Sequence, residues 1–186
     1  LLPVRRSAID TDAECTISEG SEFSATVRMG EVEQVKEAGS RGAGVRVLFG
    51  QRTGSASTTD FSEAAVRDTV RAASTIARYT AEDECAGLAD PERLARQFPD
   101  LDLRHPWPIV TDQAIELARR GEQTARAASP RITNSEGGSV STHEGIEVYG
   151  NSHGFRGAQS GTRHSVSVSV IAEDDDDMQR DYWYTV

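Results

Sequence analysis

The spacing at which hydrophobic residues recur in this sequence changes twice, and the order of these changes limits the chain to few folds. From Glu14 to Ser57 apolar and polar residues alternate, as in Phe23–Met29 and Gly42–Gly50, and a period of two indicates strands. Two stretches with helical spacing follow, and the period of two returns after Pro130. We therefore expect an α+β fold in which two long helices pack on one face of an antiparallel or mixed β-sheet.

Both expected helices carry small residues at helical spacing. The first begins with the capping-box pattern Asp60-Phe-Ser-Glu63 and runs to about Tyr79. The second is capped by Thr111 and runs to about Ser129. The expected buried stripe of the first helix is Val66, Val70, Ala73 and Ala77, widened by Thr69 and Ile76. That of the second helix is Ala114, Ala118, Gly121, Ala125 and Ala128. Alanine and glycine on these stripes let each helix axis lie close to a sheet.

Two segments of the remaining chain have recognisable patterns. In the first half, residues 16–18 and 23–29 are predicted as separate strands, with a tight turn at Gly30. Between the helices, Pro91 is expected to begin a short helix. The stretch Phe98–Pro108 cannot be a regular helix, because its prolines constrain the residues before them.

Length and charge restrict the class of protein. The 186 residues suit a single domain, residues 1–186, with a sub-boundary near residue 130. A net charge of −10 argues against direct nucleic-acid binding, and no segment approaches the ~18 apolar residues of a membrane span. Cys15 and Cys85 lack a C-x-x-C spacing, which favours free thiols in a reducing cytoplasm. Since Leu1 is not an initiator Met and a strand-like pattern runs to Val186, we expect a fragment of a longer protein.

The segment from Arg131 to Phe155 holds most of the candidate chemistry. His143-Glu144 begins like a zinc-protease motif, but no second histidine follows at the required spacing. His143, His153 and His164 could instead converge from neighbouring strands, and three histidines suffice for a catalytic zinc with an open fourth position. An independent zinc hydrolase built on these residues is one hypothesis. The alternative is that each histidine makes a hydrogen bond in a turn.

Glycines and Asn/Ser pairs in the same region suggest a surface for an extended chain. Glycine permits a positive φ or the close approach of another backbone, and such surfaces pair with peptides or partner strands. The predicted peptide or partner contacts are Asn134, Gly137, Gly138, Asn151, His153, Arg163 and His164. A peptide-binding module without proteolysis is therefore a further hypothesis, although an ordinary hairpin turn is the alternative for any single glycine.

Recognisable family motifs lie in Arg131-Ile-Thr-Asn-Ser-Glu-Gly-Gly138, Val148-Tyr-Gly-Asn-Ser-His-Gly154, Thr162-Arg-His-Ser165 and Asp181-Tyr-Trp-Tyr184. Through these segments the sequence resembles the PmbA/TldE branch of the TldD/PmbA family, and the resemblance extends in order over nearly the whole chain. It implies the N-terminal portion of a subunit from a cytoplasmic TldD–TldE heterodimeric metalloprotease, also named modulator of DNA gyrase. Such complexes trim unfolded or extended peptides, mature certain peptides and degrade an antitoxin.

The resemblance also implies where the metal lies. In this family the TldD subunit holds zinc in a His-Glu-x-x-x-His motif, in a part of its chain beyond the portion that this sequence resembles, and TldE-type subunits lack that motif. This sequence contains no His-Glu-x-x-x-His. Although the family is one of metallopeptidases, we therefore expect no catalytic residue, metal ligand or cofactor in this chain, and zinc in a TldD-like partner. Peptide substrates complete the expected partners.

Overall fold

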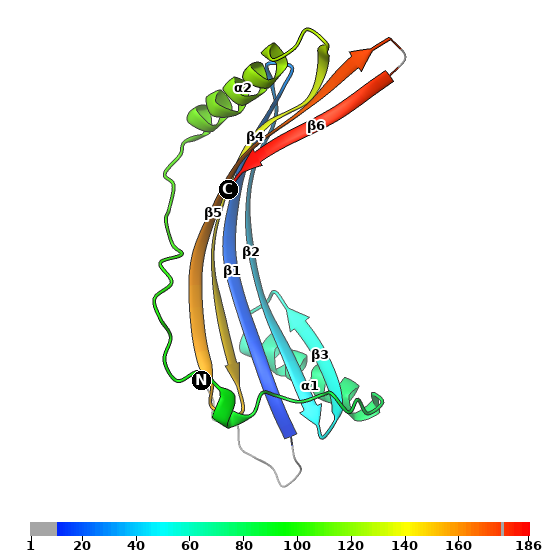
Figure 1. Cartoon of the computed structure of the whole chain (residues 1–186). Coiled ribbons are helices and arrows are strands. Elements are labelled where there is room, and N and C mark those ends of the chain that lie inside the picture. The colour runs from blue at the N-terminus through cyan, green and yellow to red at the C-terminus, as the bar shows by residue number, and fades with distance from the viewer. Residues whose placement is uncertain (1–10, 176) are drawn as a thin grey trace. The chain divides into compact units, whose positions relative to one another are not determined.

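The computed structural model describes residues 11–175 and 177–186 and shows an α+β fold (Figure 1). Its elements are β1 (Thr11–Arg28), β2 (Glu31–Phe49), β3 (Arg52–Thr58), α1 (Glu63–Tyr79), the 3-10 helix η1 (Pro91–Arg93), α2 (Thr111–Ala127), β4 (Ile132–Asn151), β5 (Arg156–Asp174) and β6 (Asp177–Thr185). A six-stranded antiparallel sheet has the order β3-β2-β1-β4-β5-β6. The α+β class and the antiparallel alternative are confirmed, and packing of both helices on one face stays a prediction.

Two units divide the described chain, and four long strands contribute to both. One unit contains residues 11–19, 40–102 and 146–160, and the other contains residues 20–39, 103–145, 161–175 and 177–186. Helix α1 and strand β3 belong to the first unit, and α2 and β6 belong to the second. The expectation of a single domain with a sub-boundary near residue 130 stays a prediction.

The strands are longer than the alternation pattern predicts. The sequence predicts separate strands at residues 16–18 and 23–29, but β1 runs without a break from Thr11 to Arg28. Strand β2 likewise continues through Gly39, Gly42 and Gly44. The prediction of short strands is wrong because these glycines, like Gly20 in β1, do not adopt a positive φ. They interrupt the side-chain pattern without ending the strand.

The turn predicted at Gly30 is confirmed. Met29 and Gly30 connect β1 to β2 and have φ values of 52° and 85°. Two consecutive positive φ values are the geometry of a type I′ hairpin, whose twist matches that of the strands.

The short helix at Pro91 and the irregular Phe98–Pro108 stretch are also confirmed.

In the first unit, α1 packs on β3 at Gly54. A Cβ atom added to Gly54 would overlap the carbonyl oxygen of Ala73 and the backbone nitrogen of Ala77, and both alanines are fully buried. Two members of the predicted stripe are misplaced, since Val66 and Val70 are 39% and 40% exposed. Thr69, Ala73 and Ala77 are the buried residues of α1, because their four-residue spacing keeps the smaller side chains against β3.

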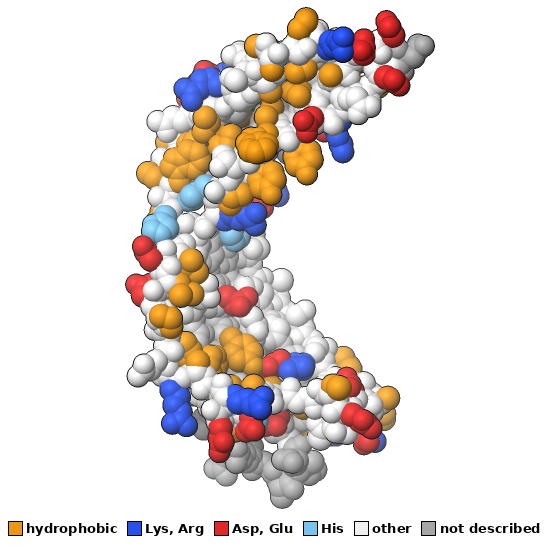
Figure 2. Space-filling view, viewed as in Figure 1, with side chains coloured by type: hydrophobic (Ala, Val, Ile, Leu, Met, Phe, Trp, Pro, Cys, Tyr) orange, Lys and Arg blue, Asp and Glu red, His pale blue; other side chains and the backbone are white. Residues whose placement is uncertain are grey.

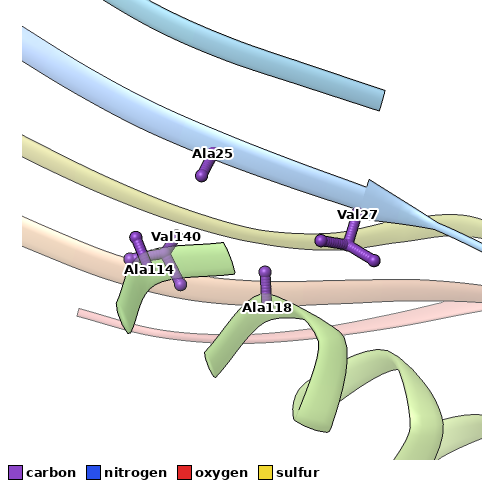
Figure 3. Packing of buried hydrophobic residues seen from close by; sticks show 5 residues of the cluster. All are labelled: Ala25, Val27, Ala114, Ala118 and Val140. Carbon is purple, nitrogen blue, oxygen red and sulfur yellow. The ribbon is translucent and has the colours of Figure 1, made fainter. Parts of the chain in front are cut away.

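In the second unit, a small core joins β1, α2 and β4. It consists of Ala25, Val27, Ala114, Ala118 and Val140, all fully buried (Figure 3). Three of its five members are alanines, which permits the close approach of helix and sheet that the sequence predicts.

The predicted start of α1 is wrong by two residues. The N-cap is Ser62, whose hydroxyl accepts a hydrogen bond from the Ala65 N–H at 3.3 Å. Asp60 instead accepts from the Ser62 N–H at 2.8 Å. The Asp60 carboxylate therefore fixes the turn before the helix, and the capping box predicted from Asp60 and Glu63 does not form.

The predicted cap of α2 is also displaced. Thr111 is the first helical residue, and the N-cap is Val110. Because valine has no side-chain acceptor, the cap is supported from inside the helix, where the Gln113 side-chain oxygen accepts from the Val110 N–H at 3.3 Å.

Candidate functional site

The turn between β4 and β5 carries two predicted contact residues, Asn151 and His153. The Asn151 N–H donates to the Phe155 carbonyl at 3.1 Å, and the Asn151 side-chain oxygen accepts from the Phe155 N–H at 3.2 Å. Gly154 completes the turn with a φ of 91° and an N–H that donates to the Asn151 carbonyl at 3.1 Å. The Asn151 side chain thus stabilises its own turn.

His153 connects this turn to two other parts of the first unit. Its Nε2 lies 3.1 Å from the Asp12 carboxylate, and its Nδ1 lies 3.0 Å from the Ala89 carbonyl oxygen. The Ser152 hydroxyl donates to the same Asp12 oxygen at 2.7 Å. Since Ser152 and His153 both bind Asp12, they do not form a Ser–His nucleophile pair. Both ring nitrogens of His153 face protein acceptors, so neither is free to bind a metal.

A row of polar side chains crosses β2, β1 and β4 in the same unit. The Tyr149 hydroxyl donates to Glu14 at 2.6 Å, and the other Glu14 oxygen forms an ion pair with Arg46 at 2.7 Å. Arg46 also reaches the Gly87 carbonyl at 3.4 Å. Burial, and then the hydrogen bond to Glu14, raises the pKa of Tyr149 above its ordinary value. Tyr149 is therefore a hydrogen-bond donor near neutral pH and unsuited to act as a base.

Three further predicted contacts lie on β4 in the second unit. Gly137 has a φ of 111°, and a Cβ atom there would lie 2.7 Å from the Val27 carbonyl oxygen. A Cβ atom on Gly138 would overlap the Ala118 carbonyl oxygen. The Asn134 side chain accepts from the Ser135 N–H at 2.8 Å. Packing within the unit explains both glycines, and contact of these residues with a peptide or partner stays a prediction.

Glu122 is an important residue that the sequence prediction missed. It is fully buried on α2 and accepts hydrogen bonds from the backbone N–H groups of Met29 at 2.7 Å and Gly30 at 2.9 Å. Burial alone would raise the pKa of Glu122, but hydrogen bonds from Ser135, Gly30 and Met29 together lower it. Its position four residues after Ala118 on the buried stripe is the signal that could have identified it.

The remaining histidines have separate environments. In His164, Nε2 lies 2.7 Å from the His105 carbonyl oxygen and the ring meets Trp107 edge-on at 5.6 Å. His143 and Arg163 are exposed. Within residues 11–175 and 177–186, no group of three or more His, Cys, Asp and Glu side chains is placed to hold a metal ion. The convergence required by an independent zinc hydrolase is therefore not present in this part of the chain.

Among the described residues, neither helix has the length and apolar character needed to cross a membrane. The hydrogen-bonded side chains around the β4–β5 turn hold backbone segments together.

Comparison with known proteins identifies the class. Residues 13–77 match the model of PmbA/TldA metallopeptidase domain 1, and residues 104–186 match that of the PmbA/TldA metallopeptidase central domain. A metalloprotease PmbA from Escherichia coli O157:H7 is 51% identical over 94% of this chain. A PmbA homologue from Haemophilus influenzae is 43% identical over the same share. The chain spans 39% of the length of both relatives.

Solved structures agree with this class. A protein from Bacteroides thetaiotaomicron, described as a candidate modulator of DNA gyrase, matches with a TM-score of 0.83 and 25% identity, covering 93% of this chain and 40% of its own. TldE from Thermococcus kodakarensis shares the fold, with a TM-score of 0.73 and 18% identity over 95% of this chain and 39% of its own. This chain belongs to the PmbA/TldD metallopeptidase family.

Proposed function

We propose that this chain is a non-catalytic subunit domain of a TldD/TldE-like metalloprotease complex that acts on unfolded or extended peptides. The observation that carries the proposal is the 51% identity to a metalloprotease PmbA over 94% of this chain, because the PmbA/TldE branch that the sequence resembles lacks the His-Glu-x-x-x-His motif of TldD. Zinc binding in such sites requires histidines held at fixed spacing. In this proposal a TldD-like subunit supplies the zinc, and the complex works in the cytoplasm on peptides for maturation or on an antitoxin for degradation.

The edge strand β6 supports a role in binding extended chains. It is the last strand of the sheet, and its aromatic residues Tyr182, Trp183 and Tyr184 are 65%, 77% and 56% exposed. The rings of Tyr182 and Tyr184 stack at 6.5 Å with an interplanar angle of 13°. An edge strand offers backbone hydrogen-bonding groups to a peptide or to a partner's strand. Hydrophobic side chains visible on the surface in Figure 2 are consistent with such contacts.

Metal analysis and reconstitution test this proposal. We expect the purified chain to hold no stoichiometric zinc after dialysis, and a TldD-like subunit to co-purify with it. Peptide cleavage should require the TldD-like subunit and should stop when zinc is chelated. One tightly bound zinc per chain that is lost in His143→Ala or His153→Ala would overturn the proposal.

The same experiment separates the proposal from a peptide-binding module that works without proteolysis. Such a module would bind unfolded peptides but would not associate with a TldD-like subunit or change its rate of cleavage.

A further inference from the structure

A groove of about 410 Å³ lies in the first unit, beside the β4–β5 turn. Its lining includes Arg96 and Phe98 from the segment that follows η1, and His153, Phe155 and Arg156 from the turn. Phe98 and Phe155 meet there edge-to-face, with ring centroids 5.5 Å apart and an interplanar angle of 81°. The aromatic pair supplies an apolar wall that can hold one side chain of a bound peptide.

Two cations, Arg96 and Arg156, line the same groove. Both are exposed, and within residues 11–175 and 177–186 neither forms an ion pair with a carboxylate. Arginines elsewhere in the chain, such as Arg46 and Arg104, pair with Glu14 and Glu144. In a chain with a net charge of −10, two uncompensated guanidinium groups in one groove favour an anionic ligand.

His153 connects the two segments that line the groove. This residue lines the groove and binds both Asp12 and the Ala89 carbonyl, which is two residues before Pro91. These contacts connect the β4–β5 turn to the segment that carries Arg96. A groove whose walls are already connected loses less conformational entropy when a ligand binds.

We propose that this groove binds a carboxylate of an extended peptide together with the apolar side chain beside it. The inference deepens the proposed function and rests on it for the choice of a peptide as ligand. The planar guanidinium groups of Arg96 and Arg156 donate paired hydrogen bonds to the carboxylate, and Phe98 and Phe155 contact the apolar side chain. The carboxylate belongs either to an Asp or Glu side chain or to the peptide's C-terminus.

Three peptides labelled with an uncharged fluorophore test the groove by fluorescence anisotropy with the full chain. The first is Ser-Gly-Phe-Asp-Ser-Gly with an amidated C-terminus, and the second replaces its Asp by Asn. The third is Ser-Gly-Ser-Gly-Ser-Phe with a free C-terminal carboxylate. We expect tight binding of the first peptide, the third or both, and weak binding of the second. Preference for the first or the third distinguishes a side-chain carboxylate from a terminal one.

Variants assign the binding to the two arginines. The double variant Arg96→Gln/Arg156→Gln should weaken binding of the carboxylate peptides at least about ten-fold, since charge-assisted hydrogen bonds are lost. The matched control Arg67→Gln/Arg71→Gln removes the same charge from α1 in the same unit and should change binding little. Circular dichroism and thermal unfolding check that each variant is folded. An Asn peptide that binds as tightly as the tighter of the two carboxylate peptides, weak binding of all three peptides, or equal weakening in the control would overturn the proposal.

Analytical ultracentrifugation tests whether an acidic segment of a second copy occupies the groove instead. Dimers that form in the wild type and dissociate in the double variant would overturn the peptide assignment, whereas a monomer in both supports it.

The peptide titrations are made in EDTA without a TldD-like subunit. If the peptides do not bind but zinc-dependent cleavage is intact, only the proposal for the groove is overturned. If this chain holds zinc, only the proposed function is overturned.

Discussion

The Glu122 carboxylate accepts a hydrogen bond from the Gly30 backbone N–H at 2.9 Å, connecting α2 to the turn between β1 and β2. Its second oxygen accepts from the Met29 N–H at 2.7 Å. Arg119, one turn earlier in α2, donates to the Gly30 carbonyl at 3.1 Å. The helix thus satisfies three backbone groups of the hairpin turn, and it holds β1 and β2 at the edge of the second unit's core.

Replacing Glu122 should destabilise the fold. In Glu122→Ala two backbone donors of the turn lose a charged acceptor, and we expect a loss of about 3 kcal/mol or more in the free energy of unfolding. Urea denaturation followed by circular dichroism measures this change. Glu116→Gln is the control, because Glu116 lies on the exposed side of the same helix in an ion pair with Arg119. A loss in the control equal to that of Glu122→Ala would contradict the assignment.

The lowered pKa of Glu122 predicts a pH dependence of stability. A carboxylate whose pKa is lower in the folded state stabilises the fold at pH values above its ordinary pKa of 4.5. This contribution is lost as the pH falls through the lower, folded-state value. We therefore expect the difference in unfolding free energy between wild type and Glu122→Gln to be largest near neutral pH and to shrink in acid. A difference that grows below pH 4.5 would show that the sign is wrong.

A substitution at Gly138 should also destabilise the second unit. A Cβ atom there would overlap the backbone of Ala118 and lie 3.2 Å from the Glu122 nitrogen, so Gly138→Ala must push α2 away from β4. We expect a cost of about 1–3 kcal/mol or more. Gly121→Ala is the matched control in α2, because its Cβ atom would meet no atom within 4 Å. It should stabilise the helix by up to about 1 kcal/mol, and thermal unfolding of both variants measures the contrast.

The pattern of the sequence correctly predicts the types of elements but not their lengths. Alternation and helical spacing depend on neighbouring residues, so the sheet and both helices could be recognised. The alternating stretch Gly42–Gly50 begins at Gly42, but Gly42 lies inside β2 without a positive φ. Local patterns cannot show whether a glycine marks a turn or the close approach of a neighbouring element, as Gly54 does beneath α1.

The candidate site was less predictable because its contacts join distant residues. Glu14 pairs with Tyr149 across 135 positions of sequence, and no spacing rule connects such residues. Asn151 and His153 were selected from the sequence, and the structure places both in one turn. Arg156, which lines the groove beside them, had no local signal of its own. Sequence patterns can therefore identify motifs that local backbone geometry determines. They cannot identify residue pairs that the topology of the sheet brings together.

His153 should control the stability of the long segment between α1 and α2. Loss of its contacts with Asp12 and the Ala89 carbonyl frees that segment from the β4–β5 turn, and a segment with fewer contacts opens more often. In His153→Ala we expect trypsin to cleave faster after Arg93 and Arg96, by about five- to ten-fold if opening becomes easier by ~1–1.4 kcal/mol. Mass spectrometry of the fragments over time measures the rate. His143→Ala, which replaces an exposed histidine on β4, should leave the rate unchanged, and equal acceleration in both variants would show that His153 does not hold the segment.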